Sequence, residues 1–209
     1  MQNEYKFDHD WFSGNIGALL HLKQNWQYLS SKPIEILEIG SFEGRSTVFF
    51  AEVFPNANIT CIDTWQGGVD HDPNNSEIDF TKIIANFHHN VAFFKDRISI
   101  NQGYSIDELC RYIGYGKKFD FIYVDGSHTA RDVLQDLVLS FKLLNVNGVI
   151  YCDDYLWGYN DTLFNGDRKI NPFNTPKMAI DAFSTIYRDV VCMPTLPYSG
   201  AAAFIKVGE

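Results

Sequence analysis

The feature that most constrains the fold is a regular alternation of strand-like and helix-like segments joined by short turns. The clearest strand, residues 119–125, is nearly continuous in apolar side chains, which is typical of a strand buried on both faces of a parallel sheet. This alternation predicts an α/β fold with an open, mostly parallel sheet. The expected strands are residues 34–39, 58–63, 98–103, 119–125, 149–154, 189–196 and 201–207, and the expected helices are residues 14–29, 45–54, 77–91, 105–113, 129–144 and 177–187.

The last two strand-like runs, residues 189–196 and 201–207, have no helix between them. They should therefore pair as an antiparallel hairpin at the sheet edge, which completes a Rossmann-like, seven-stranded sheet with helices on both faces. A chain of 209 residues is long enough for one core and short for two. We therefore expect a single domain over residues 1–209, with a helical segment at 1–33 and the α/β core at 34–209.

Turn and capping signals set the expected boundaries of the elements. Ser76, with Asp79 three positions later, resembles the N-cap of the helix at 77–91. The sequence at 145–148 is expected to turn the chain into the strand that follows it. Thr175 and Pro176 resemble an N-cap and a first helical residue.

Charge and composition exclude several classes of function. A formal net charge of −9 argues against nucleic acid as a partner. The polar start shows no secretory signal, and no run approaches the roughly 18 apolar residues of a membrane span, so no membrane partner is expected. The four cysteines are far apart with no CxxC pattern, which indicates reduced thiols and a cytoplasmic protein. The sequence does not indicate an oligomeric state.

A glycine-containing turn follows the first expected strand. Gly40 and Gly44 allow a sharp turn and a close approach to a ligand, and the helix after them starts with unpaired amides that favour an anion. Glu38, just before the turn, would repel phosphate and attract an ammonium group. The turn therefore suits a zwitterion better than a dinucleotide, and the GxGxxG pattern of nicotinamide binding is absent because Phe42 stands in it. A simple tight turn with a surface acid is the alternative.

Asp63 ends the second expected strand, where an acid commonly binds ribose hydroxyls. Together with the glycine turn, Asp63 predicts one ligand that carries both a ribose and an amino-acid head group. At this point the chain resembles the class I S-adenosylmethionine-dependent methyltransferases, over about residues 34–207. The sequence EIGSFEG is similar to the family motif E/DxGxxxG, CIDTW to its acidic end of the second strand, and NQGYS to its segment after the third strand.

The resemblance implies which residues contact S-adenosyl-L-methionine. By it, Glu38, Gly40, Ser41 and Gly44 would surround the methionine part, and Asp63 would bind the ribose. The remaining cofactor residues that it implies are Trp65, beside the adenine or the acceptor, and Gln102 and Ser105, near the adenine.

Three carboxylates end the fourth and fifth expected strands: Asp125, Asp153 and Asp154. Neighbouring parallel strands lie about 4.8 Å apart, so Asp125 can converge with Asp153 or Asp154. Carboxylates gathered without a nearby Lys or Arg would be relieved by a hard divalent cation. Since successive strand residues point to opposite faces, both Asp153 and Asp154 can bind one ion only if the strand has already ended. Alternatively, Asp125 caps the next helix and the pair is a solvated strand end.

These acids narrow the resemblance to the metal-dependent small-molecule O-methyltransferases, of the catechol and bacterial macrolide-sugar types. The resemblance implies magnesium, or a similar divalent cation, held by Asp125, Asp153 and Asp154, and a small-molecule hydroxyl as the methyl acceptor. The lysine base of the catechol type has no evident counterpart, and His128 occupies the nearby DxxH position. His128 and Asp125 are therefore the candidate catalytic residues, with His128 as base, ligand or only a helix-start hydrogen-bonding residue.

This combination is chemically consistent with methyl transfer to oxygen. The sulfonium methyl is already activated, so the reaction needs mostly positioning, a lowered pKa of the acceptor hydroxyl and a group that takes its proton. Tyr155, Trp157 and Tyr159, with the loop at 66–77, could cover the acceptor. An NAD-dependent oxidoreductase and a non-catalytic adenosylmethionine-binding protein are the competing interpretations. A serine hydrolase is disfavoured because the sequence around Ser127 does not match GxSxG.

Overall fold

The structure is a computed structural model that describes residues 4–30, 32–68, 78–158, 171, 173–194, 196 and 200–209. Seven strands form one sheet in the order β3-β2-β1-β4-β5-β7-β6. The strands are β1 (Glu35–Ile39), β2 (Asn58–Asp63), β3 (Ile98–Gln102), β4 (Phe119–Val124), β5 (Leu144–Cys152), β6 (Val191–Cys192) and β7 (Ala202–Lys206).

Strand directions follow the sequence pattern. The first five strands pair in parallel, and β7 pairs antiparallel with both β5 and β6. The predicted open sheet with an antiparallel C-terminal hairpin is therefore confirmed. The hairpin is shorter than expected on one side, because β6 contains only two residues.

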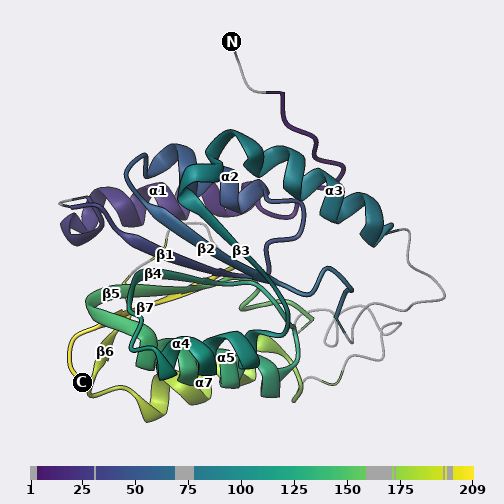
Figure 1. The fold of residues 1–209 in the computed structure, drawn as a ribbon. Helices are drawn as coiled ribbons and strands as arrows, with labels where there is room; N and C mark the ends of the chain where they lie inside the picture. Colours follow the sequence, from purple (N-terminus) through teal and green to yellow (C-terminus); the bar gives the residue numbers. More distant parts are fainter. Residues whose placement is uncertain are drawn as a thin grey trace.

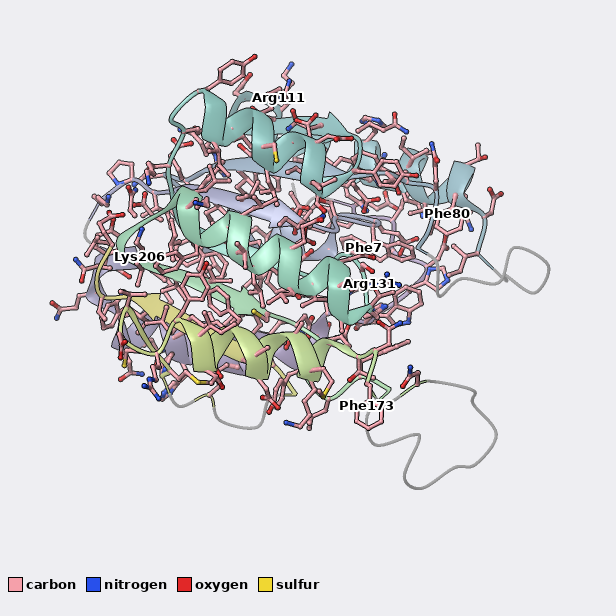
Figure 2. The ribbon with its side chains drawn as sticks, turned by 90° about the horizontal axis from the view of Figure 1, so that it is seen from below. Phe7, Phe80, Arg111, Arg131, Phe173 and Lys206 are labelled. Atoms are coloured by element: carbon pink, nitrogen blue, oxygen red, sulfur yellow. The ribbon has the colours of Figure 1, made fainter. Side chains whose placement is uncertain are left out.

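Helices cover both faces of the sheet (Figure 1). On one face lie α1 (Ile16–Asn25), α2 (Arg45–Val53) and α3 (Phe80–Val91), and on the other lie α4 (Ser105–Gly114), α5 (Ala130–Leu143) and α7 (Pro176–Ile186). Each face has its own apolar cluster, because β1, β4 and β5 are buried on both sides and alternate side chains between the two. Figure 2 views the second face, where α4, α5 and α7 lie side by side.

Two boundaries differ from the sequence prediction. Helix α3 begins at Phe80, and its N-cap is Asp79, whose side chain accepts hydrogen bonds from the amides of Thr81 and Lys82. The predicted cap, Ser76, lies outside the described residues. Strand β5 begins at Leu144, so residues 145–148 belong to the strand and not to a turn before it. The register of β5 against β4 shifts there, which accommodates the extra residues.

A buried lysine fixes the C-terminal strand against α5. Lys206 is 1% exposed, and its Nζ donates to the carbonyl oxygens of Phe141 and Leu144 at 3.4 and 3.1 Å. The last carbonyls of a helix have no partner within the helix and carry partial negative charge, so they suit an ammonium group. Glu209 accepts a third hydrogen bond from the same Nζ, at 3.1 Å. In Figure 2, Lys206 lies at the opposite end of α5 from Arg131.

A buried carboxylate fixes the segment before β1 to the sheet. Asp120, near the start of β4, is 3% exposed and accepts hydrogen bonds from Tyr28 Oη (2.6 Å), Lys32 Nζ (3.0 Å), the Glu35 amide (3.0 Å) and Asn145 Nδ2 (2.9 Å). Burial by itself would raise the pKa of Asp120, but these hydrogen bonds outweigh it and hold the pKa below its usual value. No helix among the described residues is long and apolar enough to cross a membrane.

Candidate functional site

The carboxyl ends of the central parallel strands meet at one edge of the sheet, and the candidate residues lie there. The backbone ladder continues one residue past the strands, since the Gly40 amide donates to Ile62 at 2.9 Å and the Asp125 amide to Ile39 at 2.8 Å. The turn after β1 and the acids after β4 and β5 are thereby brought to the same edge. This is the edge at which open α/β sheets bind ligands.

Position 40 has no room for any side chain, because the backbone that follows β4 lies against it. Its φ is +86°, and a Cβ at this position would lie 1.9 Å from the carbonyl oxygen of Asp125. The sequence predicts that this glycine lets a ligand approach, whereas in the structure backbone atoms of the neighbouring segment fill its Cβ position. Gly44, with φ +78°, is the N-cap of α2, and it makes no side-chain capping bond that would occupy the first amides of that helix.

Glu38 lies beneath the turn. It is 0% exposed, and its Oε2 accepts hydrogen bonds from Ser41 Oγ at 2.6 Å and Thr47 Oγ1 at 2.5 Å. Burial raises the pKa of Glu38, and these hydroxyl donors oppose the shift. The direct role that the structure gives this acid is to tie the turn to the start of α2. Its predicted attraction for an ammonium group stays a prediction.

Asp63 ends β2 and holds the same turn from the other side. Its Oδ2 accepts from the amides of Ser41 and Phe42, both at 2.8 Å, and its Oδ1 accepts from the Trp65 amide at 2.7 Å. The side chain is half-buried. Asp63 therefore lies beside the glycine turn, as the prediction of a ribose contact requires, and that contact stays a prediction.

The other predicted cofactor residues divide into two groups. Trp65 is 5% exposed, packs on Phe87 with ring centroids 4.7 Å apart, and donates its Nε1 to the carbonyl of Phe42 at 2.9 Å. Its ring is part of the core, so its predicted contact with adenine or acceptor has no support in this geometry. Gln102 is exposed at the end of β3, where its Nε2 donates to the Thr64 carbonyl at 3.2 Å, and Ser105, the first residue of α4, bonds the Asp136 carboxylate. Their predicted positions near the adenine stay predictions.

Asp125, His128 and Asp154 form a cluster. One ligand atom from each lies within 4.8 Å of the others, and His128 Nε2 is 2.9 Å from Asp154 Oδ2. Strand β5 ends at Cys152, and Asp154 has a left-handed φ of +56°. Non-glycine residues with this backbone conformation are uncommon and concentrate at functional sites.

Asp153, the third predicted metal ligand, is not part of this cluster. Its Oδ2 accepts hydrogen bonds from Tyr123 Oη and Asn15 Nδ2, both at 2.5 Å, and its Oδ1 accepts from the Asp154 amide at 2.8 Å. Tyr151 Oη in turn donates to Asn15 Oδ1 at 2.9 Å. The structure therefore brings Asp125 and Asp154 together with His128, and it directs the Asp153 carboxylate towards the N-terminal segment.

The electrostatics of the cluster favour a bound cation. Burial raises the pKa of Asp125 well above its usual range, and the charges of Asp153 and Asp154 raise it further. Burial, with the charge of Asp154, raises the pKa of Asp153 to about 6. Partly buried carboxylates that resist ionisation together are stabilised by a divalent cation. Two carboxylate oxygens and an imidazole nitrogen fit such an ion, so the residues present fit a metal site.

Trp157 packs flat on the imidazole of His128, with ring centroids 4.3 Å apart and planes 15° apart. Its amide donates to the carbonyl of Asp154 at 2.9 Å, so one turn positions both the carboxylate and the indole against His128. Tyr155, from the same turn, bonds Asp181 at 2.9 Å and accepts from Lys177 at 2.6 Å. Tyr159 and residues 69–77 of the predicted cover lie outside the described residues.

The sequence reasoning missed the N-terminal segment. A shallow hollow, open to solvent, lies between the glycine turn and this segment. It is lined by His9, Trp11, Phe12, Gly40, Ser41, Phe42, Glu43, Arg45, Ser46 and Asp125. Because residues 9–12 have no periodic or motif signal, only the long-range contacts reveal that they belong to the site.

Comparisons with known proteins agree with this geometry. A family model described as a methyltransferase domain matches residues 37–155. No curated protein matches the chain. The solved O-methyltransferase TomG from Streptomyces achromogenes, involved in tomaymycin synthesis and in complex with SAM, superposes with a TM-score of 0.63 at 18% identity, covering 94% of this chain and 82% of that one.

Two further solved structures are similar over most of this chain. The O-methyltransferase from Bacillus cereus in complex with SAH has a TM-score of 0.60 at 18% identity, and the match covers 96% of this chain and 84% of that one. MycE methyltransferase from the mycinamycin biosynthetic pathway, in complex with Mg, SAH and mycinamycin VI, has a TM-score of 0.57 at 16% identity. In that case the match covers 97% of this chain and 50% of the longer one.

Proposed function

Since the chain belongs to the methyltransferase domain family, we propose that it transfers a methyl group from S-adenosyl-L-methionine to a hydroxyl of a small molecule, with a divalent cation held by Asp125 and Asp154 beside His128. The observation that carries the proposal is the position of this cluster. It lies at the same sheet edge as the glycine turn, and the Asp125 carbonyl touches the position where Gly40 lacks a Cβ. A methyl donor held at the turn would therefore lie next to a metal-held acceptor.

The chain's own residues would bind the donor from two sides. The first amides of α2, which receive no side-chain capping bond from the N-cap residue, suit its carboxylate. Asp63, already bound to the amides of Ser41 and Phe42, lies where a ribose hydroxyl could bond it. When bound, adenosylmethionine supplies an activated methyl group, so the protein has mainly to orient the two reactants.

The acid cluster would hold the acceptor hydroxyl. When bound, the cation supplies a positive charge that lowers the pKa of a coordinated oxygen. The MycE structure, which contains Mg, SAH and mycinamycin VI, supports the choice of magnesium and of a natural-product hydroxyl as acceptor. TomG, involved in tomaymycin synthesis, supports the same class of acceptor. Manganese is an alternative ion for the same donor set.

His128 would take the proton that leaves the acceptor. If the imidazole is neutral and Nε2–H donates to Asp154 Oδ2, then Nδ1 carries the lone pair that accepts a proton. Asp154 would hold the ring in this tautomer, and Trp157 would fix its plane. Direct ligation of the cation by His128 is the other role that the cluster geometry permits.

The proposal is tested with labelled adenosylmethionine and a panel of sugar, phenol and macrolide acceptors, with magnesium and with EDTA. Label should pass to an acceptor only in the presence of the ion. Asp125→Asn should abolish calorimetric Mn²⁺ binding, whereas Asp153→Asn, the matched control, should retain it, because that carboxylate bonds Tyr123 and Asn15. Full turnover in EDTA would refute the metal, and absence of adenosylhomocysteine binding would refute the function.

A further inference from the structure

The N-terminal strap, which we define as residues 5–12, contacts the glycine turn and has no regular secondary structure. In Figure 1 the N-terminal segment, in purple, descends beside α3. Asn90 of α3, which is 0% exposed, binds both backbone groups of Lys6: its Oδ1 accepts from the amide at 2.7 Å and its Nδ2 donates to the carbonyl at 2.8 Å. The buried Asn90 side chain thus pairs with the amide and the carbonyl of Lys6, as the backbone of a neighbouring β-strand would.

Glu43 holds the middle of the strap. It is 1% exposed, and its two carboxylate oxygens accept from the Asp8 amide at 3.2 and 3.0 Å, while its Oε2 also accepts from the His9 amide at 3.0 Å. Asn86 Nδ2 donates to Oε1 at 3.0 Å. The carboxylate thus binds two backbone amides of the strap and one side chain of α3, and it belongs to the residue that directly precedes the N-cap of α2, Gly44.

The far end of the strap packs on the turn itself. Trp11 stacks on Phe42 with ring centroids 4.8 Å apart and planes 22° apart. His9 contacts the same phenyl ring, with centroids 5.4 Å apart, and its carbonyl accepts from Arg45 Nε at 3.2 Å. His9, Trp11 and Phe12 line the hollow opposite Gly40 and Ser46. One wall of the hollow is therefore made by strap side chains whose position depends on Glu43.

We propose that Glu43 is a positioning residue for the cofactor, which holds the strap across the glycine turn and so completes the pocket for the methionine end of adenosylmethionine. The inference rests on the proposed function. It adds Glu43 and the strap, which would shape the cofactor pocket without taking part in the chemistry. Glutamine is the sharp substitution, because it keeps the shape but replaces one acceptor oxygen by an NH₂ group that faces a donor in either orientation. At the Oε1 position the NH₂ faces Asn86 Nδ2 and the Asp8 amide, and at the Oε2 position it faces the Asp8 and His9 amides. Ligand binding should in turn hold the strap closed.

The test measures calorimetric affinity for adenosylhomocysteine and amide hydrogen exchange at Asp8 and His9. Glu43→Gln should weaken binding roughly tenfold, as expected for the loss of one or two buried hydrogen bonds. Adenosylhomocysteine should slow exchange at both amides in the wild type and much less in Glu43→Gln. Trp11→Ala is the second variant, used if Glu43→Gln does not fold, because the Trp11 side chain is 63% exposed and contributes little to folding. It should weaken the binding of adenosylhomocysteine several-fold.

The matched control is Asp120→Asn, which removes a similarly buried carboxylate at the opposite end of the sheet. It should leave the affinity for adenosylhomocysteine within twofold of wild type. The inference fails if a folded Glu43→Gln binds adenosylhomocysteine within twofold of wild type. It also fails if adenosylhomocysteine does not change the exchange rates of the Asp8 and His9 amides, or if Asp120→Asn weakens binding as much as Glu43→Gln. A wild-type chain that does not bind adenosylhomocysteine refutes the proposed function, whereas normal binding by both Glu43→Gln and Trp11→Ala refutes only this inference.

Discussion

Replacement of Asp120 by asparagine should cost stability in a way that depends on pH. The carboxylate accepts hydrogen bonds from four groups on three parts of the chain, and it is almost completely buried. Three of the donors, from Tyr28, Lys32 and Asn145, share Oδ1, and the Glu35 amide bonds Oδ2. Asparagine has one acceptor oxygen, so whichever way its amide turns, an NH₂ group faces a donor.

The magnitude follows from the groups left without a partner. If the asparagine oxygen takes the Oδ1 position, the Glu35 amide loses its acceptor, which costs about 1–3 kcal/mol for a buried group. Loss of the negative charge beside Lys32 adds about 1 kcal/mol, a modest value because the lysine is 44% exposed. The sum, about 3 kcal/mol, corresponds to a fall in Tm of roughly 6–12 °C for a chain of this size.

The pH dependence has a definite sign. The hydrogen bonds hold the pKa of Asp120 in the folded protein below its usual value, despite burial. The ionised carboxylate therefore contributes stability above the unfolded pKa, near 3.9, and this contribution is lost as the pH falls through the folded pKa. The difference between wild type and Asp120→Asn should be largest at neutral pH and should shrink below about pH 4.

Urea unfolding of both proteins at pH 7, 5 and 3.5, followed by circular dichroism, measures this difference. Asp107→Asn, on the exposed first turn of α4, removes one carboxylate without buried partners and should change stability by less than about 0.5 kcal/mol. A loss below 1 kcal/mol at pH 7, or a difference that stays constant down to pH 3.5, would show that the carboxylate does not act as described.

The remaining predictions concern His128 and Lys206. His128→Ala should lower the methylation rate by roughly 10²- to 10⁴-fold and leave adenosylhomocysteine affinity nearly unchanged, as single-turnover kinetics and calorimetry would show. A parallel loss of Mn²⁺ affinity would make His128 a ligand, and full activity would leave it a structural residue. Lys206→Met should lower the free energy of unfolding by about 2 kcal/mol in urea titrations, because the carbonyls of Phe141 and Leu144 lose their donor. An unchanged unfolding midpoint would mean that these carbonyls find other partners.

Local patterns predicted the fold well. Strand β4 is a continuous apolar run, and α5 has an apolar stripe, so each could be recognised from its own residues. The turn after β1 was equally visible, since its glycines and acid are adjacent in the sequence. The parallel order of the strands then places their carboxyl ends together, which is why Asp125 and Asp154 were correctly expected at one edge.

Side-chain direction past the strand ends was not predictable in the same way. Asp153 and Asp154 are neighbours in sequence, but the left-handed backbone of Asp154 turns its carboxylate towards His128, while that of Asp153 bonds Asn15. Glu38 stands just before the turn, and the sequence did not show that its side chain is buried beneath it; its attraction for an ammonium group stays a prediction. Both outcomes depend on partners supplied by other elements.

The strap was invisible for a related reason. Residues 5–12 have no helical or strand periodicity, and their conformation is fixed by Glu43 and Asn90, which lie tens of residues away. Glu43 itself occupies a variable position of the E/DxGxxxG pattern, so the motif gave it no role. A buried acid beside a glycine turn was the one available signal, and it does not identify the backbone that it binds.

The contact between Asn15 and Asp153 also orders the assembly of the site during synthesis. Asn15 leaves the ribosome 138 residues before its partner. At typical elongation rates this interval is on the order of 10 s. Throughout that time the chain just after the strap lacks its contact with Asp153, which follows β5, although Glu43 and Asn90 can already hold the strap itself. The hollow also includes Asp125, so it is complete only after β4 has been made, and a nascent chain stalled before this residue should be unable to retain adenosylhomocysteine.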